Sequence, residues 1–125
     1  MIEVNEYVRT NSGLIFKVNE ITYDEEYKDY LYKESFLLVD WKENIVKHSK
    51  QLIDLIEVGD IVNSCIVVGF GYECVNGNKE KSILVEGKYT KVNFALLNWD
   101  IETILTKEIY MANCYKVKEG EEDEC

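Results

Sequence analysis

The sequence predicts a mainly β protein, a β-rich α+β fold in which two small modules of strongly bent antiparallel sheet carry short helices and pack as one unit. Apolar residues alternate with polar ones, or run for short stretches that stop at Asn, Gly or Asp, which is typical of strands and turns. The sequences Asn11-Ser12-Gly13 and Asn76-Gly77-Asn78 suit hairpin turns, because Gly and Asn adopt positive φ readily. An internal repeat divides the strands into two sets.

The internal repeat relates residues 2–8 (IEVNEYV) to residues 56–62 (IEVGDIV), and residues 45–49 to residues 104–108. Each copy has an acidic turn, strands around a glycine, a long strand and a capped short helix, which is the order of elements in small SH3-like barrels. Two half-sized units of this kind would bury together the apolar faces that neither buries alone. Chance similarity between short amphipathic strands is the alternative explanation.

The repeat sets the expected boundaries of the modules and their elements. We expect an N-terminal SH3-like β module over 1–55, a C-terminal SH3-like β module over 56–118 with a short helix near 106–113, and an acidic tail over 119–125. The expected strands cover 4–10, 14–21, 30–41, 61–70, 71–75, 81–86, 91–99, 101–105 and 114–118, and the stretch 30–41 has a break near Glu34-Ser35. Ser49 is expected to cap a short helical or 3₁₀ turn over 52–56, and Thr106 to cap the helix that ends at Asn113.

Acidic residues dominate the charge, since 24 Asp and Glu oppose 14 Lys and Arg and give a formal net charge of −10. Proteins that bind nucleic acids need clustered Lys and Arg to displace counterions from phosphates. Arg9 is the only arginine, so we expect no direct binding to nucleic acid or to an anionic membrane. The acidic surface would attract basic partners, or simply keep the protein soluble. With neither a leader sequence nor a membrane span, the expected location is the cytoplasm of a bacterial host cell.

No motif in the sequence predicts catalysis, a metal or a cofactor. The four cysteines form no Cys-x-x-Cys pair, and the single histidine, His48, leaves no paired Cys/His spacing for zinc. His48 adjoins Ser49, but Ser49 is better explained as a helix cap than as a nucleophile. The sequence contains no phosphate-binding glycine loop and no GxSxG. We therefore expect a non-enzymatic protein without catalytic residues, metal ligands or cofactor.

Two tryptophans adjoin carboxylates, in Asp40-Trp41 and Trp99-Asp100. Neighbours in an extended strand point to opposite faces, so one member of each pair is expected inside and the other outside. A tryptophan at a strand end more often fills a core than forms a shelf for a ligand. We expect these tryptophans to be core residues.

The segment from Tyr23 to Tyr32 is the strongest candidate for a binding site, with four tyrosines, four acids and one lysine in ten residues. Tyrosine supplies rigid contact area with a polar tip, and carboxylates set between flat rings can imitate the phosphates beside nucleic-acid bases. The candidate partner-binding residues are Tyr23, Asp24, Glu25, Glu26, Tyr27, Asp29, Tyr30 and Tyr32. The alternative is a solvated hairpin whose tyrosines pack across the strands.

Three parts of the chain resemble small uncharacterised proteins of phages and prophages from low-GC Gram-positive bacteria. They are residues 45–63, residues 104–108 with 114–117, and residues 6–10 with Gly13. Together these parts cover about half of the chain, while Ile109-Tyr110 and the segment 23–32 depart from the family's pattern. The resemblance implies a small β-rich phage accessory protein and implies no reaction.

The acidic segment and this resemblance together suggest an inhibitor of a host defence protein that has a basic nucleic-acid-binding cleft. Small acidic phage proteins similar to this one include anti-CRISPR inhibitors, so a Cas9-type nuclease, which holds nucleic acid in a cationic channel, is the first candidate partner. One alternative is an oligomer that sequesters a small nucleotide ligand. Another is a passive structural or interaction module.

Overall fold

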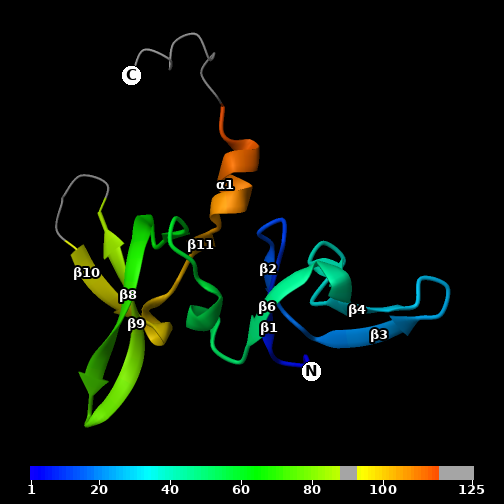
Figure 1. Cartoon of the computed structure of the whole chain (residues 1–125), viewed down its shortest axis with the longest axis horizontal. Coiled ribbons are helices and arrows are strands. Elements are labelled where there is room, and N and C mark those ends of the chain that lie inside the picture. The colour runs from blue at the N-terminus through cyan, green and yellow to red at the C-terminus, as the bar shows by residue number, and fades with distance from the viewer. Residues whose placement is uncertain (88–92, 116–125) are drawn as a thin grey trace.

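The computed structural model describes residues 1–87 and 93–115, in two halves that lie side by side (Figure 1). Of these residues 49% lie in strands and 15% in helices, and all the strand pairs are antiparallel, which confirms the mainly β class. The strands stay in open sheets, and no closed barrel forms in the described part of the chain.

The first half contains two three-stranded sheets, with the orders β2-β1-β6 and β3-β4-β5. Its elements are β1 (Tyr7–Thr10), β2 (Ile15–Lys17), β3 (Glu20–Asp24), β4 (Asp29–Lys33), β5 (Val39–Trp41), the 3₁₀ turn η1 (Lys42–Asn44) and β6 (Ile45–Ser49). The two sheets enclose one core, to which Val8, Phe16 and Tyr32 contribute. Burial of these side chains holds the short strands together, since so few hydrogen bonds would not do so alone.

The second half contains one five-stranded sheet with the order β10-β9-β8-β7-β11. Its elements are the 3₁₀ turn η2 (Leu52–Leu55), β7 (Ile61–Val62), β8 (Cys65–Val75), β9 (Asn78–Glu86), β10 (Asn93–Leu97), the 3₁₀ turn η3 (Asn98–Asp100), β11 (Ile104–Leu105) and the helix α1 (Lys107–Asn113). Ile53 of η2 packs into the core of this sheet together with Val67 and Ile83. The turn η2 therefore anchors the chain in the second half just after it leaves the first.

The matched residues 2–8 and 56–62 form the same local structure. The backbone N–H of Glu6 donates to the carbonyl of Glu3 at 3.1 Å, and that of Asp60 to the carbonyl of Glu57 at 3.1 Å. Each turn is closed by its own acid: the carboxylate of Glu6 accepts from the N–H of Glu3 at 3.0 Å, and that of Asp60 from the N–H of Glu57 at 2.8 Å. The residue before each acid has positive φ, 80° at Asn5 and 100° at Gly59. The sequence match thus reflects a repeated acid-closed turn.

Several expected elements differ from those observed. Gln51, rather than Ser49, is the N-cap of η2, because Ser49 belongs to β6 and uses its hydroxyl to bind the N–H of Gln51 and the carboxylate of Asp54. The break expected near Glu34-Ser35 in the stretch 30–41 is observed as a loop at 34–38. The helix capped by Thr106 is confirmed as α1. Residues 116–118 of the expected last strand and the acidic tail 119–125 lie outside the described residues.

Candidate functional site

The segment predicted as a binding site forms the β3–β4 hairpin, which extends away from the second half (Figure 1). Asp24 and Asp29 face each other as the last cross-strand pair before the turn. A carboxylate oxygen of Asp24 accepts from the N–H of Tyr27 at 2.7 Å, and Lys28 takes positive φ of 58° to reverse the chain. The side chain of Asp24 therefore closes the turn with a hydrogen bond and also contributes to the negative charge of the turn.

Alternation along the strands divides the tyrosines between two faces. Tyr23 pairs with Tyr30, and their rings meet edge to face at 5.0 Å between centroids. Tyr32 lies two residues farther along the same face and is only 1% exposed within the first core. The prediction that Tyr32 supplies partner contact area is wrong, because this position falls where the hairpin meets the body of the protein.

Tyr27 lies against Trp41, which is on the face opposite Tyr32 because Trp41 pairs with Leu31. The rings of Tyr27 and Trp41 stack at 4.2 Å between centroids with 28° between their planes. The hydroxyl of Tyr27 donates to Oε2 of Glu43 at 3.1 Å. That hydrogen bond is the main reason why the pKa of Tyr27 is raised. The ring is fixed at both ends and still 54% exposed.

Carboxylates surround this stacked pair. Asp29 accepts from the backbone N–H of Glu43 at 3.2 Å, which joins the hairpin turn to η1. Glu25 and Glu26 are exposed in the turn, and neither forms an ion pair with a described residue. We name this cluster the hairpin end, and its members are Asp24, Glu25, Glu26, Tyr27, Asp29, Trp41 and Glu43. Sequence reasoning missed Glu43, whose only signal is its place two residues after Trp41. The expectation that Trp41 is a core residue is also wrong, because Trp41 is half-buried and stacks on Tyr27.

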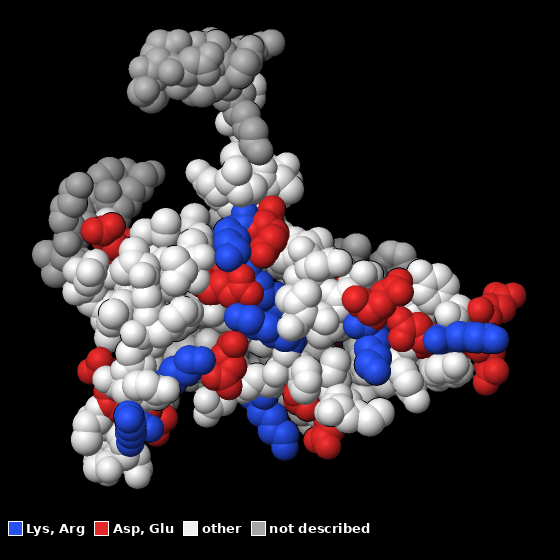
Figure 2. Space-filling view, viewed as in Figure 1, with Lys and Arg blue, Asp and Glu red and all other residues white. Residues whose placement is uncertain are grey.

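Figure 2 shows that acidic and basic side chains alternate over much of the face drawn, while acids surround a single base at the end formed by the β3–β4 hairpin. The hairpin end is thus a local concentration of negative charge. Lys28 is the one cation within the turn itself.

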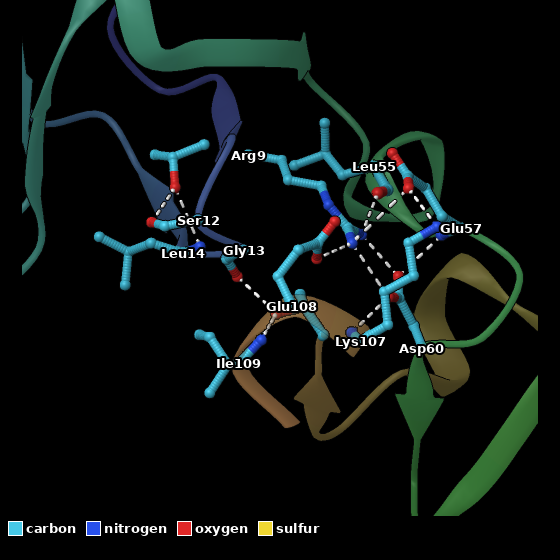
Figure 3. Close-up of polar contacts among 12 residues, drawn as sticks. Arg9, Ser12, Gly13, Leu14, Leu55, Glu57, Asp60, Lys107, Glu108 and Ile109 are labelled. Carbon is cyan, nitrogen blue, oxygen red and sulfur yellow. Dashed lines mark hydrogen bonds and ion pairs between the residues drawn. The ribbon is translucent and has the colours of Figure 1, made fainter. Parts of the chain in front are cut away.

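Arg9, the only arginine, is completely buried between the two halves (Figure 3). Its Nη1 donates to Asp60 at 2.5 Å and to the carbonyl of Leu55 at 2.9 Å. Its Nη2 donates to Asp60 at 3.0 Å and to Glu108 of α1 at 2.6 Å. These carboxylates outweigh desolvation, and the pKa of Arg9 is raised. The guanidinium joins β1, the second acid-closed turn and α1, and none of it faces solvent.

Glu57 extends this cluster to the surface. Its carboxylate lies 2.9 Å from Nζ of Lys107, 3.2 Å from Nζ of Lys47 and 3.8 Å from Nη2 of Arg9. The hydrogen bond from Lys107, followed by the other cations, lowers the pKa of Glu57 to about 2 against partial desolvation. The halves are therefore joined by alternating charges.

Replacement of Glu57 by Gln is expected to change how stability depends on pH. Because the folded-state pKa is below the ordinary value of 4.5, these ion pairs stabilise the fold above pH 4.5, and their contribution is lost as the pH falls towards 2. Urea unfolding should give a wild-type advantage of up to about 1 kcal/mol near neutral pH, vanishing at acid pH. Glu73→Gln is the control, because Glu73 is exposed and forms no ion pair with a described residue. A difference from wild type that stayed constant over this pH range would contradict the assignment.

The remaining predicted positions have structural surroundings. Nδ1 of His48 lies 2.6 Å from the buried carboxylate of Glu6, and this hydrogen bond lowers the pKa of Glu6. Trp99 is 60% exposed, so the expectation of a core role there is wrong; η3 ends the strand and turns the indole outward. In the described ranges, no group of three His, Cys, Asp or Glu is placed to hold a metal ion, and no helix is both long and apolar enough to cross a membrane.

Comparisons of the chain with protein-family models, with curated proteins and with solved structures found no match. The resemblance to phage proteins stays a prediction. Function is therefore inferred from the geometry of the hairpin end and of Arg9.

Proposed function

We propose that this protein is a non-enzymatic phage accessory protein whose hairpin end binds a basic nucleic-acid-binding cleft of a host defence protein and blocks it. A Cas9-type nuclease is the first candidate partner, because such an effector holds its nucleic acids in a positively charged channel. The activity is anti-CRISPR-like competition for that channel.

The observation that carries the proposal is the Tyr27–Trp41 stack with carboxylates around it. A flat, immobilised pair of rings flanked by anions has the chemistry of a base beside its phosphates. The stack and the hydrogen bond to Glu43 order Tyr27 before binding, so little side-chain entropy is lost in the complex. Lys and Arg side chains that hold phosphate would pair equally with these carboxylates.

Burial of Arg9 weighs against the alternative of a nucleotide-binding oligomer. A phosphate site would draw first on a guanidinium fork, but Arg9 is completely buried, and both of its Nη groups already donate to Asp60, Glu108 and the carbonyl of Leu55. The sequence offers no second arginine to replace it.

The decisive variant neutralises the four acids of the turn, as Asp24→Asn, Glu25→Gln, Glu26→Gln and Asp29→Asn. Asp24→Asn keeps the oxygen that accepts from the N–H of Tyr27, and Asp29→Asn keeps one of the two oxygens that accept from Tyr30 and Glu43, so the fold is expected to persist. The association rate with a guide-loaded Cas9-type nuclease should fall at least about 10-fold at low salt, because electrostatic steering is lost. The same rate for wild type should fall as salt rises. Surface plasmon resonance measures both, and a DNA-cleavage assay measures inhibition.

A matched control removes the same charge elsewhere, as Glu3→Gln, Glu73→Gln, Glu80→Gln and Glu86→Gln. If the position of the charge matters, this control binds much more like wild type than the turn variant does. Equal losses in both variants would show that only net charge matters. Undiminished inhibition by the turn variant would exclude the hairpin end as the interface.

A further inference from the structure

The loop at 34–38 exposes two large apolar side chains to a degree unusual for a folded protein. Phe36 is 93% exposed and Leu37 is 80% exposed, next to each other at its tip. Adjacent exposed residues of this kind mark contact sites more often than isolated ones do. We name this feature the Phe36 loop.

The Phe36 loop is braced rather than loose. The N–H of Glu34 donates to the carbonyl of Leu38 at 2.8 Å, and the N–H of Leu38 donates to the hydroxyl of Ser35 at 3.3 Å. The side chain of Asn19 donates to the carbonyl of Glu34 at 3.1 Å, and Leu38 packs against the first core. The backbone therefore holds Phe36 and Leu37 outward as a fixed knob.

A groove of about 350 Å³ begins at the base of this loop and runs between the two halves of the protein. Its apolar lining comes from both halves and consists of Ile15, Phe16, Leu52, Ile101 and Ile104. Glu34 lines the groove and is also the first residue of the Phe36 loop, so knob and groove are neighbours. One wall is β2, which is an edge strand of its sheet.

We propose that this groove receives the Phe36 loop of a second copy of the chain, and that the two copies form a two-fold symmetric dimer by exchanging knobs. An isologous interface needs each copy to carry both complementary features on one surface. Here the apolar knob and the groove, which has apolar residues in its lining, share Glu34, and this meets that need. The proposal goes beyond the inhibitory activity and does not depend on it.

The charges around the groove fit a second copy. The groove carries Lys17 and Glu102, and the base of the knob carries Lys33 and Glu34. Within one chain, Glu34 accepts from the backbone N–H of Lys17 at 2.9 Å, and Nζ of Lys33 lies 3.9 Å from the exposed carboxylate of Glu20. In the symmetric dimer Nζ of Lys17 would face the carboxylate of Glu34 of the second copy, and Glu102 would compete with Glu20 for Lys33. Such pairing gives the interface local balance although each chain has a net charge of −10.

The size of the contact suits a weak dimer. Each knob offers roughly 300 Å² of apolar area, and the groove exposes less surface than a knob, so the exchange of two knobs buries at most about 1,200 Å². That area is at the lower end for specific interfaces, so dissociation in the micromolar range is expected.

Sedimentation velocity on the full chain tests the dimer, from about 1 to about 200 µM protein. Wild type should dimerise with rising concentration, and more strongly at about 500 mM than at about 50 mM salt, because salt screens the repulsion between acidic chains. This salt dependence is opposite to that expected for the hairpin end on a basic cleft. The variant Phe36→Ser/Leu37→Ser should stay monomeric with unchanged circular dichroism.

Control variants separate this interface from other sources of association. Tyr115→Ser removes a comparably exposed ring, 87% exposed beyond α1 and outside the groove lining, and should leave the dimer intact. Glu102→Lys should weaken the dimer, and adding Lys33→Glu should restore it. Wild type that stays monomeric throughout, or a dimer that survives Phe36→Ser/Leu37→Ser, would overturn the proposal. Either result leaves the test of the hairpin end unaffected, since that test measures binding to the nuclease.

Discussion

Arg9→Ala is expected to lower the free energy of unfolding by about 3–5 kcal/mol, a large part of the stability of a domain of this size. The loss of the ionic attraction between Arg9 and Asp60 is only part of the reason. Removal of the guanidinium leaves Asp60, which is completely buried, without its ionic partner, and leaves the carbonyl of Leu55 without that donor. A buried unpaired carboxylate costs several kcal/mol, or must take up a proton.

Urea denaturation at neutral pH measures this loss, with Lys81→Ala as the matched control. Lys81 also pairs with an aspartate, Asp54 at 3.2 Å, but both side chains are 38% exposed. That pair should contribute only about 0–1 kcal/mol. Arg9→Lys should recover little of the loss, because one ammonium cannot replace a fork that reaches Asp60, Glu108 and Leu55 together. An Arg9→Ala loss as small as that of Lys81→Ala would refute a structural role for this cluster.

Gly13→Ala is expected to lower the free energy of unfolding by about 2–5 kcal/mol, from two separate causes. Gly13 has φ of 93°, a conformation that costs a residue with a Cβ about 1–2 kcal/mol. An added methyl group would also overlap Oγ1 of Thr106 and lie only 2.8 Å from Cβ of Glu108. Thr106 has little freedom to retreat, since its hydroxyl donates to the carbonyl of Gly13 at 2.7 Å and caps α1.

Gly77→Ala separates these two causes in the same thermal or urea experiment. Gly77 has a similar φ of 83° at the β8–β9 turn, but nothing lies within 4 Å of an added methyl group. This variant should lose only the backbone contribution of about 1–2 kcal/mol. The excess loss at Gly13 measures how tightly α1 closes on the first half. Equal losses at the two glycines would mean that this contact yields without cost.

Both predictions address the junction between the halves, where sequence reasoning succeeded only in part. The acid-closed turn depends only on residues that are close together in the sequence. The match between residues 2–8 and 56–62 was therefore enough to predict that the turn occurs twice. The partners of the two acids could not be found that way. Glu6 binds His48, whereas Asp60 binds Arg9 from the other half, 51 residues away.

At the hairpin end, too, the sequence predicted some features and only the structure showed the others. The sequence located the turn, its four acids and its tyrosines, because Asn, Asp and Gly mark turns and alternation marks strands. Counting tyrosines could not separate Tyr27, exposed against Trp41, from Tyr32, buried in the core. That distinction depends on which face of the hairpin meets the body, and Glu43 entered the site only through the pairing of β4 with β5.

The sequence by itself determined what depends on neighbouring residues: the β class, the turns at Gly13 and Gly77, the cap at Thr106 and the excess of acid. Period, turn chemistry and composition act over a few residues, so they can be read along the chain. Only the tertiary structure decided that the single arginine is buried and joins the two halves, that Trp99 is exposed, and that Phe36 lies beside a groove with both apolar and charged lining. Those outcomes depend on how distant strands cross and which faces they bury, and a one-residue change of register would reverse them.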